Sequence, residues 1–468
     1  MTSTPAAPLE SQPISTPSKG ILNKKVLSWA SWDWGSAAFN AVATTFVFSV
    51  YLTSDGMFTD KDTATSSLSL GMLVAGICIA LLAPITGQRA DRRGKGGVWL
   101  GWFTFAVVIC LALMFFVAPD SPLGKTNALW MGIALLAIGN VFFEFASVNY
   151  NAMLNHLATK ENTGRISGLG WGLGYVGGIV LLLILFVGFI NPEVGWFGVT
   201  SENGMNVRVS MLIAAAWFGI FALPVVLNPP KPRVTHDPGR ESLAQSYRNL
   251  WGTVKSLWKH ARQTLFFLVA SAVFRDGLAG VFTYGGIIAG TVFGFSAGQV
   301  IIFAIAANVV AGIATIAFGA LDDKIGPKKV IVFALSLMIV AGLGVFFFYG
   351  GGQPVFWVLG LILCIFVGPT QSASRTFLAR IIPDGREGEV FGLYATTGRA
   401  VSFLSPALYG LALLVGRAVV GSGESAAHWG ILGIMVVLLA GLVLVLPIKA
   451  DTNLEAFDAA RDAEDAAK

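Results

Sequence analysis

The stretch GQRADRRGKG, Gly87 to Gly96, recurs later in the chain as GALDDKIGPK, Gly319 to Lys328. Each copy follows one long apolar segment and precedes another. Three positions carry the same residue in both copies: Gly87 and Gly319, Asp91 and Asp323, and Gly94 and Gly326. A polar loop that returns in the same relation to its apolar neighbours indicates a duplicated unit, so we expect two similar halves.

Other segments extend this internal repeat. Asn151 to Gly174 aligns without gaps with Arg375 to Gly398, and Asp33 aligns with Asp276. The longer alignment has five identical pairs: Leu154/Leu378, Gly164/Gly388, Gly168/Gly392, Leu169/Leu393 and Gly174/Gly398. Each match relates a segment of the first half to the segment of the same rank in the second half. Two such halves are expected to enclose a central site.

The composition is that of a membrane protein. The 468 residues are 55% hydrophobic and only 12% charged, which is too apolar for a soluble protein of this size. Apolar stretches of about 20 residues, long enough to cross a bilayer, recur along the chain. They predict an all-α polytopic membrane protein with twelve transmembrane helices in two pseudo-symmetric six-helix halves. The predicted spans lie near residues 27–52, 67–86, 97–117, 128–149, 166–190, 209–227, 265–290, 298–320, 329–349, 355–378, 390–415 and 428–447.

The distribution of basic residues predicts the orientation. With an even number of spans, both termini lie on the same side of the membrane. Of the 31 Lys and Arg residues, only Lys61, Lys125, Arg208 and Arg417 fall in loops of the opposite side. Because Lys and Arg concentrate in cytoplasmic loops, both termini are expected to be cytoplasmic.

The expected organisation has five parts. A disordered cytoplasmic tail (1–26) precedes the first half (27–228), and a cytoplasmic linker (229–262) leads to the second half (263–448) and a cytoplasmic tail (449–468). From Leu243 onward the linker places apolar residues at helical spacing, with basic residues on much of the remaining surface. This pattern predicts a basic amphipathic helix on the cytoplasmic leaflet, with a soluble helix packed on the bundle as the alternative.

Several classes of function find no support in the sequence. The three cysteines lie in apolar spans, and the four histidines are too scattered for a metal site. No glycine-rich phosphate loop ends in Lys-Ser or Lys-Thr. The net charge of +5 reflects the cytoplasmic loops rather than nucleic-acid binding. We therefore expect neither an enzyme nor a protein with a metal or another cofactor.

The loop GQRADRRGKG resembles the signature loop between spans two and three of the major facilitator superfamily, although Arg89 replaces the usual apolar residue. The resemblance implies that Asp91 contacts a helix end of the other half and that Arg92 joins a cytoplasmic latch. Because a helix N-terminus attracts anions, such a contact could form and break with conformation. The cytoplasmic gate implied by the two loop copies comprises Gly87, Asp91, Arg92, Gly94, Asp323, Lys324 and Gly326.

The chain is also similar to the vacuolar-effluxer-like, autophagy-related permeases over nearly the whole membrane region. The resemblance rests on SWASWDWGSAAFNAVATTFVFSVYL, SVNYNAML, GRISGLGWGLGYVGG, FRDG, PTQSASRTFLARIIPDGREGEVFGLYATTG and FLSPALYG. It implies export of amino acids from the vacuole in fungi, whereas bacterial members mostly have undefined substrates. Because the chain lacks a long soluble insertion of the fungal kind, we expect a bacterial member in the inner (plasma) membrane.

Charged residues within the spans are candidates for binding cargo or protons. A charge at the centre of a span costs about 2.5 to 3.5 kcal/mol, so it usually faces a partner or water. Asp33 and Asp276 are interpreted as pseudo-symmetric carboxylates at a central cavity, able to bind a proton or a substrate amine. The alternative for Asp33 is a charge near the membrane interface, within an aromatic belt of neighbouring tryptophans. Arg275 precedes Asp276 but points about 100° away on a helix, so the two need not pair.

Further candidates lie in spans four, ten and eleven. Glu144 and either Arg375 or Arg399 could form an ion pair across the halves that breaks during transport, although purely structural pairing fits equally well. Uncharged polar side chains in spans four and ten could recognise a zwitterion or a sugar, or could simply bond neighbouring helices: Asn149, Tyr150, Asn151, Gln371, Ser372 and Ser374. Asn40, near mid-depth in span one, is a further candidate.

Together these features predict a secondary active transporter that moves a small metabolite by alternating access. Amino acids are the first candidate cargo, and protons are the candidate coupling ion. The alternatives are an exporter of amphipathic, drug-like compounds and a transporter-like sensor or scaffold that moves nothing. Both loop motifs favour a carrier, because a scaffold needs no alternating latch. The expected partners are a small-molecule substrate, protons and the lipid bilayer but no nucleic acid, with the chain acting as a monomer.

Overall fold

The computed structural model describes residues 23–230, 242–383, 385–421 and 424–449. Twelve helical segments in these ranges are long and apolar enough to cross a membrane, which confirms the predicted number. The predicted tails, 1–26 and 449–468, lie almost entirely outside the described residues, as does 231–241 of the predicted linker.

The first half contributes six spans, of which the first is irregular. It consists of α1 (Lys24–Ala37), a π-helical segment (Ala38–Phe46) and α2 (Phe48–Leu52). The other five spans are α3 (Lys61–Arg93), α4 (Gly96–Leu113), α5 (Lys125–Ala152), α7 (Thr163–Leu185) and α8 (Met205–Leu227). The short helix α6 (Leu154–Leu157) continues α5.

The second half follows the linker helix α9 (Leu243–His260). Four of its spans are single helices: α10 (Arg262–Thr291), α11 (Ala297–Ile325), α12 (Pro327–Phe347) and α17 (Gly430–Val445). The tenth span is broken into α13 (Gln353–Ile365) and α14 (Val367–Ile381), and the eleventh into α15 (Glu387–Val401) and α16 (Leu404–Val420).

Local sequence signals explain several helix ends. Asp60 caps α3 by accepting a hydrogen bond from the Thr63 amide, and Gly94 ends that helix in the left-handed conformation. Ser296 and Gln299 form a reciprocal capping box at the start of α11. Pro327 occupies the first position of α12, where its missing amide hydrogen leaves no helical bond unmade.

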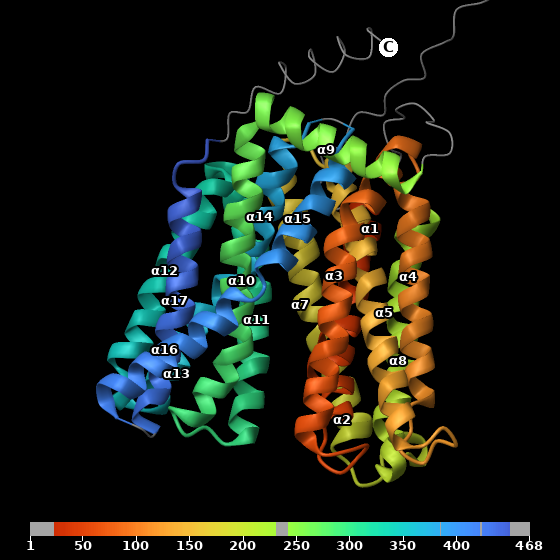
Figure 1. Cartoon of the computed structure of the whole chain (residues 1–468), viewed down its shortest axis with the longest axis vertical. Coiled ribbons are helices and arrows are strands. Elements are labelled where there is room, and N and C mark those ends of the chain that lie inside the picture. The colour runs from red at the N-terminus through yellow and green to blue at the C-terminus, as the bar shows by residue number, and fades with distance from the viewer. Residues whose placement is uncertain (1–22, 231–241, 384, 422–423, 450–468) are drawn as a thin grey trace, which may run out of the picture.

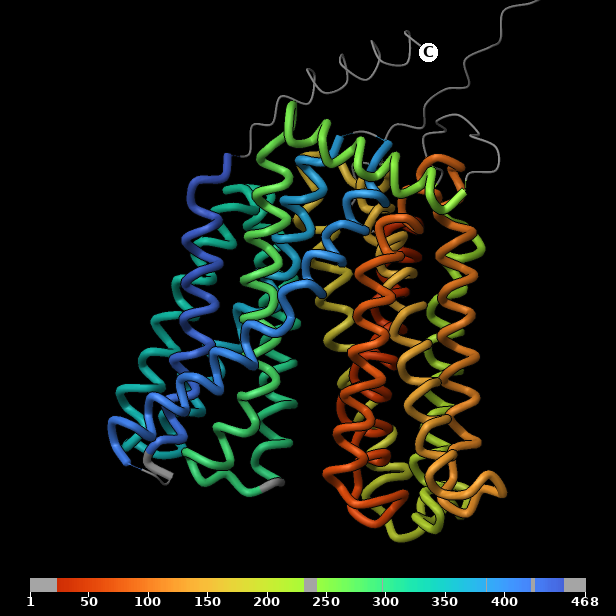
Figure 2. The backbone as a smooth tube through the Cα atoms, in the orientation of Figure 1, coloured from red at the N-terminus to blue at the C-terminus, as the bar shows by residue number. Residues whose placement is uncertain are grey.

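The two halves lie side by side, and α9 crosses them at one end (Figure 1). We call this end the linker side. The ribbons approach one another on the linker side and diverge toward the other end (Figure 2). The most extensive contacts between the halves are those of α7 with α11 and of α3 with α15, and α7 also contacts α14 and α5 also contacts α15.

Glycines make the close approach between the halves possible. Gly164, Gly168 and Gly172 recur every fourth residue on the face of α7 that packs against α11. A Cβ atom on Gly168 would lie only 2.7 Å from the carbonyl oxygen of Thr315. The backbones therefore touch directly, as small residues allow in membrane proteins.

Candidate substrate site and linker-side gate

An ion pair joins the two halves near the linker side. The Asp33 carboxylate, on α1, lies 3.5 Å from Nη1 of Arg375, on α14. The same carboxylate oxygen accepts a hydrogen bond of 2.9 Å from the Tyr150 hydroxyl. The side chains of Asp33 and Arg375 are only 16% and 5% exposed. Removal of one partner of this buried pair would be strongly destabilising, because the other charge would be left alone there.

The remaining donors of Arg375 also bind the first half. Its Nε donates to the Ser167 hydroxyl at 3.0 Å, its Nη2 to the Ser167 carbonyl at 2.7 Å, and its Nη1 to Asn151 Oδ1 at 3.2 Å. The guanidinium also lies 5.0 Å from the ring centre of Trp29 and 5.7 Å from that of Trp171. Through these bonds Arg375, in the second half, connects the two halves.

A second, more exposed ion pair crosses the halves. Arg399 Nη2, on α15, lies 2.6 Å from Glu144 Oε1, on α5, and 3.5 Å from Asn140 Oδ1. The Arg399 and Glu144 side chains are 30% and 26% exposed. The expected Glu–Arg pair across the halves is thus present, with Arg399 as its basic member. Because both ends are partly accessible, a charged ligand can compete for them.

The side-chain amides of Asn40 and Gln371 are free to bind a ligand or water. Neither side chain makes a hydrogen bond with the rest of the described chain. Asn40 is exposed and lies seven residues beyond Asp33 in the irregular first span; Gln371 is partly exposed and precedes Arg375 by one helical turn. An exposed amide within a span favours contact with water or a ligand rather than lipid tails.

Asp276 has a different environment from its repeat counterpart Asp33. Its carboxylate accepts a 2.6 Å hydrogen bond from the Ser405 amide, in the first turn of α16. Asp276 is buried within the second half and caps a helix there. Arg275 faces elsewhere, with its guanidinium 3.7 Å from the ring centre of Tyr394, so these neighbours have separate partners as expected.

Asn149 lies outside this polar group. It is fully buried, and its Nδ2 donates to the Phe145 carbonyl of its own helix at 2.8 Å. Its side chain lines a small cleft near Gly96 and Pro230, together with Asp91. Asn151, two residues on, points to Arg375 instead, because successive helical residues face different directions.

The candidate gate on the linker side contains both copies of the loop motif. Asp91 accepts hydrogen bonds of 3.0 and 2.9 Å from the amides of Gly388 and Glu389, at the N-terminus of α15. Asp323 accepts bonds of 2.7 and 3.1 Å from the amides of Gly164 and Arg165, at the N-terminus of α7. Each aspartate therefore binds a helix N-terminus of the other half, where backbone N–H groups favour an anion.

Other gate candidates take supporting positions. Gly87 packs against Gly388, and its repeat counterpart Gly319 against Gly164. Arg92 lies close enough to interact electrostatically with Glu389. Gly326 has a φ of 90°, which suits glycine at the turn that follows α11. Lys324 is exposed in the last turn of α11.

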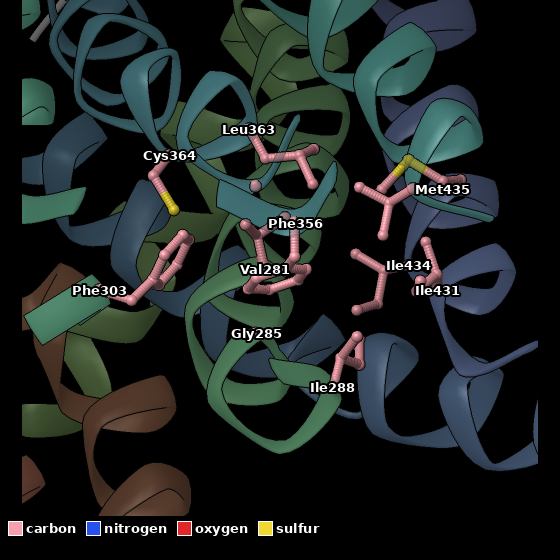
Figure 3. Close-up of a pocket in the computed structure, with 12 residues that line it drawn as sticks. Val281, Gly285, Ile288, Phe303, Phe356, Leu363, Cys364, Ile431, Ile434 and Met435 are labelled. Atoms are coloured by element: carbon pink, nitrogen blue, oxygen red, sulfur yellow. The ribbon is translucent and has the colours of Figure 1, made fainter. Parts of the chain in front are cut away.

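An apolar cavity lies away from these polar groups. Figure 3 shows it inside the second half, lined by side chains that include Val281, Phe303, Phe356 and Met435. Its volume of about 30 Å³ has room for about two water molecules. Because the lining comes from one half alone, this cavity does not belong to the site between the halves.

Sequence reasoning missed three residues of the site: Asn140, Ser167 and Trp171. Asn140 precedes Glu144 by one helical turn, and this spacing could have placed it on the same face. Ser167 and Trp171 share one face of α7. The surrounding glycines led us to interpret this segment only as a surface for close helix packing.

Comparison with known proteins agrees with this architecture. Residues 155–452 match the family described as vacuole effluxer Atg22-like, and residues 2–182 match the Major Facilitator Superfamily. The chain belongs to the vacuole effluxer Atg22-like family. Its twelve spans and paired loop motifs are those of a major facilitator protein of this family, as the sequence resemblance implied.

Relatives of this Atg22-like chain occur in bacteria and fungi. An uncharacterised MFS-type transporter of Bacillus subtilis, YxiO, is 23% identical, and the match covers 92% of this chain and 96% of the relative. Autophagy-related protein 22-1 of Aspergillus fumigatus is 24% identical over 53% of this chain and 43% of its own length. The chain thus matches less than half of that fungal protein.

Solved structures show the same fold. The proton:xylose symporter XylE superposes with a TM-score of 0.69 at 15% identity, over 92% of this chain and 98% of XylE. FucP, solved in the outward conformation, gives a TM-score of 0.65 at 13% identity, over 91% and 99%. These likenesses show that this Atg22-like chain has the major facilitator fold. The family matches identify it as an MFS-type membrane transporter.

Proposed function

We propose that this Atg22-like chain is a secondary active transporter of small zwitterions, with amino acids as the first class to test. The supporting observation is the ion pair of Glu144 and Arg399, which crosses the halves and remains partly exposed. An amino acid carries the same two charges, one at each end. Its carboxylate would bind the Arg399 guanidinium and its ammonium group the Glu144 carboxylate.

This exchange leaves no charge unpaired. Substrate binding replaces one ion pair by two, whereas a singly charged ligand would leave either Glu144 or Arg399 without a partner. The free amides of Asn40 and Gln371 would bind polar groups elsewhere on the cargo. A neutral sugar or an amphipathic cation satisfies this charge pattern less well.

We also propose that protons drive transport through Asp33. The charged carboxylate binds Arg375 and helps to hold the halves together on the linker side. Arginine keeps its charge at physiological pH, so protonation of Asp33 would weaken the pair from one side only. Proton binding would then favour separation of the halves on that side. Asp276 is the less favoured coupling candidate because it caps a helix within one half.

We also propose an orientation of the chain in the membrane. The linker side would be cytoplasmic, as the basic residues predict, in a bacterial inner membrane with both termini inside. The structure would then represent a state closed to the cytoplasm. A membrane-impermeant maleimide should label the exposed variant Lys95→Cys only after permeabilisation of the cells; labelling of intact cells would reverse the orientation.

Flux measurements in proteoliposomes test the cargo and the coupling ion. A labelled amino-acid mixture is supplied with and without a proton gradient to wild type, Glu144→Gln and Asp33→Asn. Glu202→Gln, an exposed carboxylate outside the site, is the control. We expect the wild type and the control to show gradient-dependent flux. Glu144→Gln should weaken binding about 10- to 100-fold, the usual effect of losing a charged hydrogen bond.

Asp33→Asn should still exchange substrate across the membrane but should no longer respond to the gradient. Flux that stays gradient-dependent in Asp33→Asn would rule out Asp33 as the coupling site. Absence of flux for every amino acid, with flux of amphipathic compounds, would favour the drug-like exporter. Binding without flux of any compound would favour the sensor.

A further inference from the structure

The linker helix α9 is bonded to both halves at the gate. Toward the first half, the Ser246 hydroxyl accepts a 3.1 Å hydrogen bond from Arg89 Nε, and the Tyr247 hydroxyl donates to the Leu81 carbonyl at 3.0 Å. Toward the second half, Thr253 accepts a hydrogen bond from Arg386. Opening of the linker side must therefore break the bonds of α9 to at least one half.

These contacts continue into the gate itself. Arg386 also lies 3.2 Å from a carboxylate oxygen of Glu389, whose other oxygen accepts a 2.9 Å bond from Gln88. Glu389 is the same residue whose amide binds Asp91. The position of α9 is thus linked through Arg386 to the helix N-terminus that Asp91 holds.

A second face of α9 carries exposed aromatic side chains. Tyr247, Trp251 and Trp258 are 41%, 61% and 53% exposed, and their spacing of four and seven residues places them on one side of the helix. The Tyr247 hydroxyl reaches Leu81, which lies about 18 Å before the end of α3 at 1.5 Å per residue. This face therefore points toward the apolar spans, where tryptophan and tyrosine sit at a membrane interface.

Basic residues border the aromatic face. Lys255 lies 5.8 Å from the ring centre of Trp251, and Arg262 lies 5.3 Å from that of Trp258. Arg248 and Lys259 are exposed on the same side of the helix, and the sequence of α9 contains no acidic residue. The basic row thus has the charge and the position to bind acidic headgroups at a membrane surface.

We propose that α9, together with Arg262 at the start of α10, binds acidic phospholipid headgroups through Arg248, Lys255, Lys259 and Arg262, and that this binding favours the state closed on the linker side. In that state α9 is bonded to both halves and presents the complete row along the membrane surface. Release from one half must displace the helix from this position. Headgroups that bind the complete row better than the displaced one shift the equilibrium toward closure, whatever the cargo.

The test measures the gate distance in bilayers of different charge. Spin labels on Lys95→Cys and Lys329→Cys, with the native cysteines replaced, report the separation of the halves on the linker side. The protein is placed in nanodiscs of phosphatidylcholine alone or with phosphatidylglycerol. We expect the acidic lipid to raise the ratio of closed to open protein by about fivefold or more, the lower range of allosteric coupling.

Two variants separate lipid binding from coupling. Replacement of all four basic residues by Gln should abolish the lipid response, whereas four exposed lysines elsewhere, Lys24, Lys25, Lys160 and Lys449, should be replaceable by Gln with the response retained. The double variant Ser246→Ala and Thr253→Val removes the Arg89 bond to the first half and the Arg386 bond to the second half, but keeps the Tyr247 bond to Leu81 and the basic row. It should still bind acidic vesicles through α9 and should lose the gate response.

Each contrary result overturns the proposal. A wild-type distance distribution that ignores lipid charge would exclude regulation by acidic lipid. An equal response in the four-Gln variant and its lysine control would exclude the basic row as the binding surface. An unchanged gate response in the Ser246 and Thr253 variant would exclude α9 as the coupling element. A variant with Lys and Arg exchanged at the four positions keeps the charge and should respond as wild type does.

Discussion

Arg375 is the residue on which the closed contact depends most directly, because a single guanidinium binds Asp33, Asn151 and Ser167 of the opposite half. Arg375→Gln would leave the Asp33 carboxylate without its counter-charge. We expect the free energy of unfolding to fall by about 3 to 5 kcal/mol, as is usual when one partner of a buried ion pair is removed. Denaturant titration in mixed micelles measures this change.

The double variant Asp33→Asn and Arg375→Gln is the control for that interpretation. It removes both charges, so no carboxylate is left unpaired, and we expect it to be more stable than Arg375→Gln alone. A double variant whose loss equals the sum of the two single losses would show that the ion pair does not account for the effect.

At the residue scale, the sequence identified the charged groups but not all of their partners. Glu144 lies within the membrane and needs a positively charged partner, and the sequence offers both Arg375 and Arg399 in the second half. Which arginine binds Asp33 and which binds Glu144 depends on the depth and rotation of α14 and α15, and the sequence pattern does not fix these. Ser167 was missed because a serine among glycines carries no charge that demands a partner.

The packing of α7 against α11 leads to a prediction at the scale of helices. Gly168→Ala would place a Cβ atom 2.7 Å from the Thr315 carbonyl oxygen, closer than carbon and oxygen can approach. We expect this substitution to disfavour the state closed on the linker side and to lengthen the distance between labels on Lys95→Cys and Lys329→Cys.

Gly76→Ala is the matched control, because it lies within α3 and a Cβ atom there would meet nothing within 4 Å. Both substitutions raise intrinsic helix propensity by a similar amount, roughly 1 kcal/mol, so only the contact between the halves differs. An equal shift in the two variants would refute the steric explanation.

The break in the eleventh span gives Asp276 a structural role that can be measured. Asp276→Ala removes the acceptor for the Ser405 amide and should lower the free energy of unfolding by about 0.5 to 2 kcal/mol, as for other helix caps. Asp276→Asn keeps an acceptor and should retain both stability and gradient-dependent flux. A stable Asp276→Asn variant that loses the gradient dependence would make Asp276 a proton-coupling group instead.

Helix ends have local sequence signals, but the predicted spans did not use them, and the span predicted near 67–86 is shorter at both ends than α3. Asp60, Gly94, Ser296 and Pro327 are capping residues with a local mechanism, and each lies at the end of a helix. The breaks in the tenth and eleventh spans each lie four residues before a proline, Pro369 in α14 and Pro406 in α16, which cannot bond the carbonyl of the preceding turn. In the eleventh span the Asp276 carboxylate, far away in the sequence, also binds the first turn of α16. The eleventh predicted span was continuous because its apolar character continues across the break.

At the scale of the whole molecule, the repeat explains how the gate is built. Asp91 binds the helix that begins near Gly388, and Asp323 binds the helix that begins near Gly164. These aspartates are repeat counterparts, and so are the two glycines, so one contact occurs twice with the halves exchanged. The sequence could predict this duplication, whereas the state in which both contacts are made at once depends on the relative position of the halves.

In the proposed mechanism, a zwitterion moves through alternating access of these two halves. The most direct test measures two distances in bilayers, one between Lys95→Cys and Lys329→Cys on the linker side and one between Asp62→Cys and Thr291→Cys on the opposite side. On addition of the transported amino acid, we predict that the first distance lengthens while the second shortens. Distances that ignore every amino acid, or that change in the same direction, would contradict the account.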